Sequence, residues 1–149
     1  MSQLKYGIEK SKEDASLLKS WKEDGYIVIR NFFNPTDVDH INHLVDHLWV
    51  TRTSDSNKLI IDTHLNTDQH QRMLFRNVTK EVRASPYKLN DLYLEHEEIR
   101  NVVLNMELTR IIGLLLKGTP LVINTLNFEF GSQQDDHVDT FYMPPKKTN

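Results

Sequence analysis

The segment that begins at Asn34-Pro35 can fold into little other than an amphipathic helix. Asparagine is a favoured N-cap, and proline is favoured at the first helical position because the N–H that it lacks would have no partner there. Apolar residues then recur at helical spacing and predict one buried stripe, made of Val38, Ile41, Leu44, Val45, Leu48 and Trp49. The chain therefore contains a helix that packs on a core.

Two more segments have a helical pattern with recognisable ends. Residues 11–24 begin with Ser11 as a candidate N-cap and carry two acidic residues in the first turn. Another helix is expected after Asn105, which can cap it, and Lys117-Gly118 ends it. Its apolar residues are Leu108, Ile111, Ile112, Leu115 and Leu116.

Runs of β-branched and aromatic residues lie between these helices and after the last of them. The long polar stretch 51–83 holds only short apolar islands, which predicts brief strands at most. Pro86 favours the start of one further helix, over residues 87–97. Strands are expected at 26–30, 59–61, 73–75, 121–130 and 137–142. The fold class predicted from these elements is α+β.

The composition limits the class of protein. A chain of 149 residues with 38% hydrophobic residues can form one domain with a core, or part of one. No stretch reaches the roughly 18 apolar residues of a membrane span, and the N-terminus lacks the apolar core of a signal peptide. We therefore expect a cytoplasmic protein with no membrane partner. The net charge of −3 is dispersed without a basic stripe, so no nucleic-acid partner is expected.

Metal chemistry in this chain would depend on histidine and carboxylate, because the chain has no cysteine. His137 and Asp139 are two residues apart in a strand-like segment, so both side chains can point to the same face. Two histidines and one carboxylate hold ferrous iron in oxygenases and leave positions open for a co-substrate and O₂. The spacing alone is a weak signal, because about 0.6 His-x-Asp pairs are expected by chance in a chain of this composition.

The other histidines fit surface positions better than a metal site. His96 lies in the predicted helix 87–97, where side chains two residues apart diverge by about 200°. The three histidines of the helix that begins at Asn34-Pro35 share one face, but that face lies opposite the apolar stripe and should meet solvent. These three residues are His40, His43 and His47. His64 and His70 lie in the polar stretch and are expected at the surface, with a substrate cleft as the alternative.

Three segments, in their order along the chain, resemble the phytanoyl-CoA dioxygenase family of Fe(II)/2-oxoglutarate oxygenases. DGYIVIRNFFNPTDVDHINHLV resembles the opening strand and helix of that family. LLLKGTPLVINT resembles the entry to its core, and LNFEFGSQQDDHVDTFYMPP resembles its metal-binding strand. The resemblance covers most of the chain and is weakest over residues 51–83.

The resemblance implies a double-stranded β-helix, a jelly-roll variant with N-terminal helices packed outside and iron inside the barrel mouth. On this reading His137 and Asp139 are iron ligands. Thr125 and Asn127 could point inward and hydrogen-bond 2-oxoglutarate, or they could be polar residues on an exposed strand face. Phe141 is in phase with the metal pair and could line the substrate pocket, or it could be an ordinary core aromatic.

The sequence departs from the family pattern at its C-terminal end. Family members supply a third ligand, a histidine, after the His-x-Asp strand, and an arginine that clamps the distal carboxylate of 2-oxoglutarate. No histidine or arginine follows Asp139 here, and about half of the strands of a jelly roll can be identified. We therefore expect residues 1–149 to be the N-terminal part of a single dioxygenase domain, inactive by itself.

The function implied is hydroxylation of a C–H bond in a small organic substrate, with Fe(II) as cofactor and 2-oxoglutarate and O₂ as co-substrates. Two alternatives remain open. The chain could be a non-catalytic remnant or interaction module with a vestigial metal motif. It could also belong to a cupin-like metalloenzyme that does not use 2-oxoglutarate.

Overall fold

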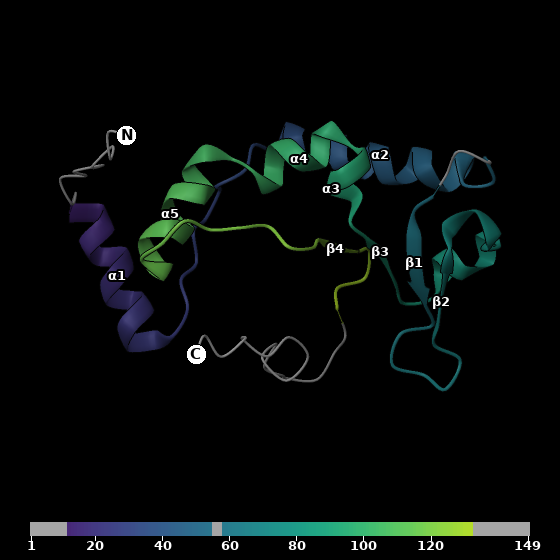
Figure 1. Ribbon diagram of the computed structural model, residues 1–149, viewed down its shortest axis with the longest axis horizontal. Coiled ribbons are helices and arrows are strands. Elements are labelled where there is room, and N and C mark those ends of the chain that lie inside the picture. Colours follow the sequence, from purple (N-terminus) through teal and green to yellow (C-terminus); the bar gives the residue numbers. More distant parts are fainter. Residues whose placement is uncertain (1–11, 55–57, 133–149) are drawn as a thin grey trace, which may run out of the picture. The chain divides into compact units, whose positions relative to one another are not determined.

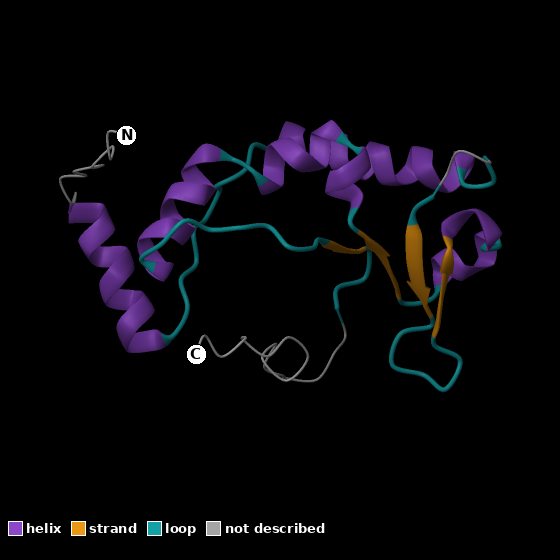
Figure 2. Ribbon diagram, viewed as in Figure 1, coloured by secondary structure: helices purple, strands orange, loops and turns teal. Residues whose placement is uncertain are grey.

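A computed structural model describes residues 12–54 and 58–132 of the chain (Figures 1 and 2). This part contains five α-helices, two short 3₁₀ helices and four β-strands. The chain divides into two compact units. The first comprises Met1–His43 and His96–Ile123, and the second comprises Leu44–Glu95 and Asn124–Asn149.

The first unit is helical. It holds α1 (Lys12–Asp24), the beginning of α2 (Pro35–Thr51), α4 (Glu97–Val103) and α5 (Met106–Leu116). α1 contacts α5, and Arg110 of α5 donates a hydrogen bond of 2.8 Å to Asp14 of α1, whose side chain is buried. Pairing of this carboxylate offsets the cost of burying its charge.

α5 has the ends that its sequence predicts. The side chain of Asn105 accepts hydrogen bonds from the backbone N–H groups of Glu107 (3.0 Å) and Leu108 (3.1 Å). At the other end Lys117 adopts a left-handed conformation with φ 56°, and its N–H donates to Gly113 O. These contacts satisfy backbone groups that have no partner inside the helix.

The second unit is built on a four-stranded antiparallel sheet in the order β2-β1-β3-β4. Its strands are β1 (Ile60–Thr63), β2 (Gln71–Leu74), β3 (Tyr87–Asn90) and β4 (Leu126–Phe128). Two 3₁₀ helices, η1 (Phe75–Asn77) and η2 (Lys80–Ala84), connect β2 to β3. The short α3 (Leu92–Glu95) follows β3.

α2 packs on one face of this sheet through Trp49. The indole ring meets Phe75 and Tyr87 edge to face, with centroid distances of 4.8 Å and 5.1 Å. Its N–H donates to the Tyr87 hydroxyl at 2.8 Å. Tyr87 and Leu89 are two residues apart in β3, so both point toward this side, and both are fully buried. This face holds the core of the second unit.

The predicted mixture of helices and strands is confirmed, as are α1, α2 and α5 within one residue or two of the expected ends. The islands at 59–61 and 73–75 do form strands, displaced by a residue or two as β1 and β2. The apolar stripe of α2 is buried at its C-terminal end only: Val45, Leu48 and Trp49 are buried, whereas Val38 is 46% exposed.

Three predicted elements are wrong, wholly or in part. Residues 26–30 form no strand; Tyr26 and Val28 are 65% and 66% exposed, and β propensity cannot make a strand without a partner. The first part of the helix expected over 87–97 is a strand instead: residues 87–90 form β3, which pairs with β1 and buries two apolar side chains. Of the strand expected at 121–130, only 126–128 is paired.

No helix of the described residues is both long and apolar enough to cross a membrane.

Candidate functional site

The predicted iron ligands His137 and Asp139 lie outside the described residues, as does Phe141. The described chain reaches Ser132, shortly after β4. Within residues 12–54 and 58–132, no three His, Asp or Glu side chains come close enough to hold a metal ion. The metal pair therefore stays a prediction from the sequence.

Thr125 and Asn127, the predicted 2-oxoglutarate ligands, lie at and just before β4. Asn127 is directly opposite Leu89, so its side chain shares the sheet face that packs toward α2. The main-chain oxygen of Thr125 accepts a hydrogen bond from the Asp91 N–H at 2.8 Å, and the Thr125 N–H donates to the Asp91 carboxylate at 2.9 Å. The Thr125 hydroxyl oxygen is buried and has no hydrogen-bond partner among the described residues.

The histidines of α2 lie where the sequence predicts, whereas His96, expected within a helix, is the extended N-cap residue of α4. Those of α2 are all exposed, in agreement with a solvated face: His40, His43 and His47. His64 is half-buried and lines a cavity of about 290 Å³ together with Thr63 and Gln71. His70 is exposed, with its Nε2 4.0 Å from a carboxylate oxygen of Asp62.

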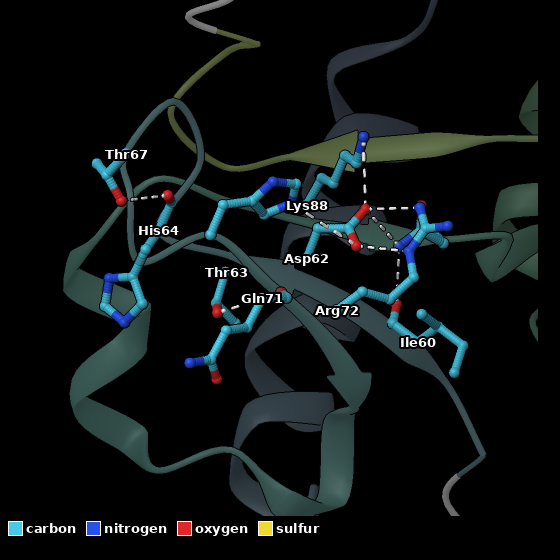
Figure 3. A network of polar contacts seen from close by, with 10 residues as sticks. Ile60, Asp62, Thr63, His64, Thr67, Gln71, Arg72 and Lys88 are labelled. Atoms are coloured by element: carbon cyan, nitrogen blue, oxygen red, sulfur yellow. Dashed lines mark hydrogen bonds and ion pairs between the residues drawn. The ribbon is translucent and has the colours of Figure 1, made fainter. Parts of the chain in front are cut away.

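Asp62 is the centre of a charged cluster that the sequence predictions did not include. It lies in β1 directly opposite Arg72 of β2 on one side and Lys88 of β3 on the other, so all three side chains share one face. This face is the one opposite Tyr87 and α2. Figure 3 shows Arg72 and Lys88 reaching Asp62 from different sides.

The Asp62 carboxylate is almost fully enclosed by hydrogen-bond donors. Arg72 donates to both oxygens, from Nε at 2.6 Å and from Nη2 at 2.8 Å (Figure 3). Asn90 donates to Oδ2 at 3.3 Å, and the Lys88 ammonium lies 3.4 Å from the same oxygen. The Asp62 side chain is only 2% exposed, and that of Lys88 is 14% exposed. The carboxylate holds two cations in fixed positions on this face of the sheet.

Opposing effects act on the Asp62 pKa. Burial raises it, but the hydrogen bonds from Arg72 and Asn90 and the charges of Arg72 and Lys88 together lower it below the ordinary value of 3.8. The pKa of Arg72 is raised by its hydrogen bonds and its attraction to Asp62. Both groups are therefore charged at neutral pH.

A second network fixes the end of β4. Arg83 of η2 donates to both carboxylate oxygens of Glu129 and, from Nη2, to Asp46 of α2 at 2.5 Å. The Tyr87 hydroxyl accepts from Trp49 and donates to Glu129. Burial raises the pKa of Glu129, but the hydrogen bonds from Arg83 and Tyr87 lower it overall. Burial and the neighbouring carboxylate raise the pKa of Tyr87, which keeps its proton.

The sequence contains a partial signal for the Asp62 cluster. Asp62 directly follows the apolar island 59–61, where a carboxylate must be exposed or paired, and Arg72 directly precedes the next island, 73–75. Lys88 carried no such signal, because the segment was predicted to be helical. Comparison of the chain with protein-family models, curated proteins and solved structures finds no match.

Proposed function

We propose that this chain carries part of the iron site of an Fe(II)- and 2-oxoglutarate-dependent dioxygenase, on a jelly-roll barrel. The reaction proposed is hydroxylation of a C–H bond in a small organic substrate. The observation that carries the proposal is the order of three family-like segments along the chain, ending in the run GSQQDDHVDTFY. His137 and Asp139 within it supply the imidazole nitrogen and carboxylate oxygen that ferrous iron takes in oxygenases.

Two features of the described residues support the proposal. The first is an antiparallel sheet, the kind of strand pairing from which a jelly-roll barrel is built. The second is the face opposite α2, where Arg72 and Lys88 are held by Asp62. Fixed cations suit an anionic group of the organic substrate. They lie on the sheet face opposite Asn127, so they would not share one 2-oxoglutarate molecule with it.

Each residue of the proposed site has a distinct role. Iron, with 2-oxoglutarate and O₂, would supply the oxidation of the C–H bond. His137 and Asp139 would hold the metal from one rigid strand. Thr125 and Asn127 would donate hydrogen bonds to 2-oxoglutarate, for which the unpaired Thr125 hydroxyl is suited. Phe141 would exclude water from the substrate carbon.

The test is Fe(II) binding and 2-oxoglutarate-dependent succinate production, measured on this chain and on the longest protein that contains it. We expect His137→Ala to abolish iron binding in whichever form binds iron. His40→Ala, at an exposed position of α2, should leave binding unchanged. Equal iron binding in the parent protein and His137→Ala would contradict the proposal. Absence of iron binding from every form would favour a non-catalytic interaction module.

A further inference from the structure

Tyr87 of β3 is a buried phenol whose hydroxyl has both a donor and an acceptor. Its side chain is fully buried, whereas Tyr26 is 65% exposed. The Tyr87 hydroxyl accepts a hydrogen bond of 2.8 Å from the Trp49 indole N–H and donates its own proton to Oε2 of Glu129. Trp49, Tyr87 and Glu129 all belong to the second unit. The proton of this buried phenol therefore has a carboxylate as its immediate neighbour.

A phenol beside a carboxylate loses one electron more easily than a buried phenol without such a neighbour. A phenol keeps its proton at neutral pH, but removal of an electron turns it into a strong acid that must pass the proton on. Without an acceptor the positive charge would stay in the core at a high cost in free energy. Burial raises the pKa of Glu129, but the hydrogen bonds from Arg83 and Tyr87 hold it below the ordinary value of 4.5. Glu129 is therefore a base at neutral pH and can take the proton.

Arg83 makes the neighbouring Trp49 a poorer site for oxidation than Tyr87. Its guanidinium lies over the Trp49 ring, 5.9 Å from the ring centroid. This position stabilises the neutral ring, but an oxidised indole would carry a positive charge and be repelled by the guanidinium. The ring centroids of Trp49 and Tyr87 are only 5.1 Å apart. An electron can therefore pass from Tyr87 to an oxidised Trp49, which favours Tyr87 as the final site.

We propose that Tyr87 is a redox-active tyrosine, which is oxidised by one electron while Glu129 accepts its proton. The O–H bond of Tyr87 breaks, and the electron passes to a strong one-electron oxidant, such as an oxidised transition-metal complex. The proton forms an O–H bond at Oε2 of Glu129, so the products are a neutral tyrosyl radical, a protonated glutamate and the oxidant reduced by one electron. The Glu129 side chain is 30% exposed, which gives the proton access to solvent.

The radical can be assigned to one residue because the chain has five tyrosines. Replacement of Tyr6, Tyr26, Tyr93 and Tyr142 by Phe leaves Tyr87 alone. After oxidation by a photogenerated ruthenium(III) complex and rapid freezing, electron paramagnetic resonance should show a tyrosyl radical in this chain. A matched chain that keeps only the exposed Tyr26 should give a tyrosyl radical that decays faster, because other molecules reach it. A tryptophanyl signal in place of the tyrosyl signal, or no radical at Tyr87, would overturn the proposal.

Glu129→Gln, in the chain with Tyr87 alone, tests the proton acceptor. Glutamine keeps the shape and an oxygen that accepts the hydrogen bond, but its amide is not a base, so most of the tyrosyl signal should be lost. The control is Glu107→Gln in α5, which removes a carboxylate paired with Arg110 and should leave the signal unchanged. Circular dichroism checks that both variants fold. Equal signals in the two variants would exclude Glu129 as the acceptor.

A second measurement of the same step needs no change at Glu129. Because the proton moves with the electron, the radical at Tyr87 should form more slowly in deuterium oxide than in ordinary water. Equal rates in the two solvents would contradict transfer of the proton to Glu129. These experiments need neither iron nor 2-oxoglutarate, so their results are independent of the proposed function.

Discussion

Asp62 shows how one buried charge organises a face of the second unit. Arg72 donates hydrogen bonds to both of its oxygens, Asn90 donates to one of them, and the Lys88 ammonium lies beside it. A buried carboxylate is tolerated only with such partners, and removing it leaves cations without a counter-charge. The cluster therefore links β1 to both of its neighbouring strands through side chains as well as through the backbone.

We expect Asp62→Ala to lower the free energy of unfolding by about 3 kcal/mol, at the low end for a broken buried ion pair because Arg72 is largely solvated. Urea unfolding followed by tryptophan fluorescence measures this change, since Trp49 lies in the same unit. The control is Asp68→Ala at an exposed position, which should change stability by less than about 0.5 kcal/mol. Similar losses in the two variants would show that the Asp62 pairing does not contribute.

At the scale of elements, local signals predicted the helices better than the strands. α1, α2 and α5 each have acidic residues or a capping side chain at the start and an apolar period, and all three form as expected. β3 was not predicted, because the apolar–polar alternation of its four residues, YKLN, is too short to exclude a helix. Pairing with β1, from another part of the chain, decides its conformation.

The Asn105 cap gives a prediction at this scale. Asn105→Ala should lower the stability of α5 by about 1 kcal/mol, because two backbone N–H groups lose their acceptor. Asn105→Asp keeps an acceptor oxygen and should retain most of that stability. Far-UV circular dichroism during urea unfolding measures the change, with Asn42→Ala at an exposed position of α2 as control. No difference between Asn105→Ala and Asn105→Asp would contradict the role of the cap.

At the scale of the whole molecule, the two carboxylate networks predict loss of stability in acid. The pKa values of Asp62 and Glu129 are lowered in the folded chain from ordinary values of 3.8 and 4.5. The unfolded chain therefore takes up protons first as the pH falls. The stabilisation is complete above the ordinary values and is lost as the pH falls through the lowered ones.

We expect the free energy of unfolding to be nearly constant from neutral pH to about pH 5 and to fall between about pH 5 and about pH 3. Asp62→Asn should be less stable at neutral pH and should lose less on acidification, because one of the carboxylates with a lowered pKa is gone. Urea unfolding at a series of pH values measures both slopes. Parallel curves for Asp62→Asn and the parent chain would rule out Asp62 as a source of the acid sensitivity.

The sequence by itself determined the features that depend on neighbours along the chain: three helices with their ends, the solvated histidine face of α2, and the His-x-Asp spacing at His137 and Asp139. Caps and helical periods act within a few residues, so they can be read locally. Only the tertiary structure decided that 87–90 is a strand, that 26–30 is not, and that Asp62 meets Arg72 and Lys88. Strand pairing and charge burial join residues far apart in the sequence, and no local pattern specifies which partner they find.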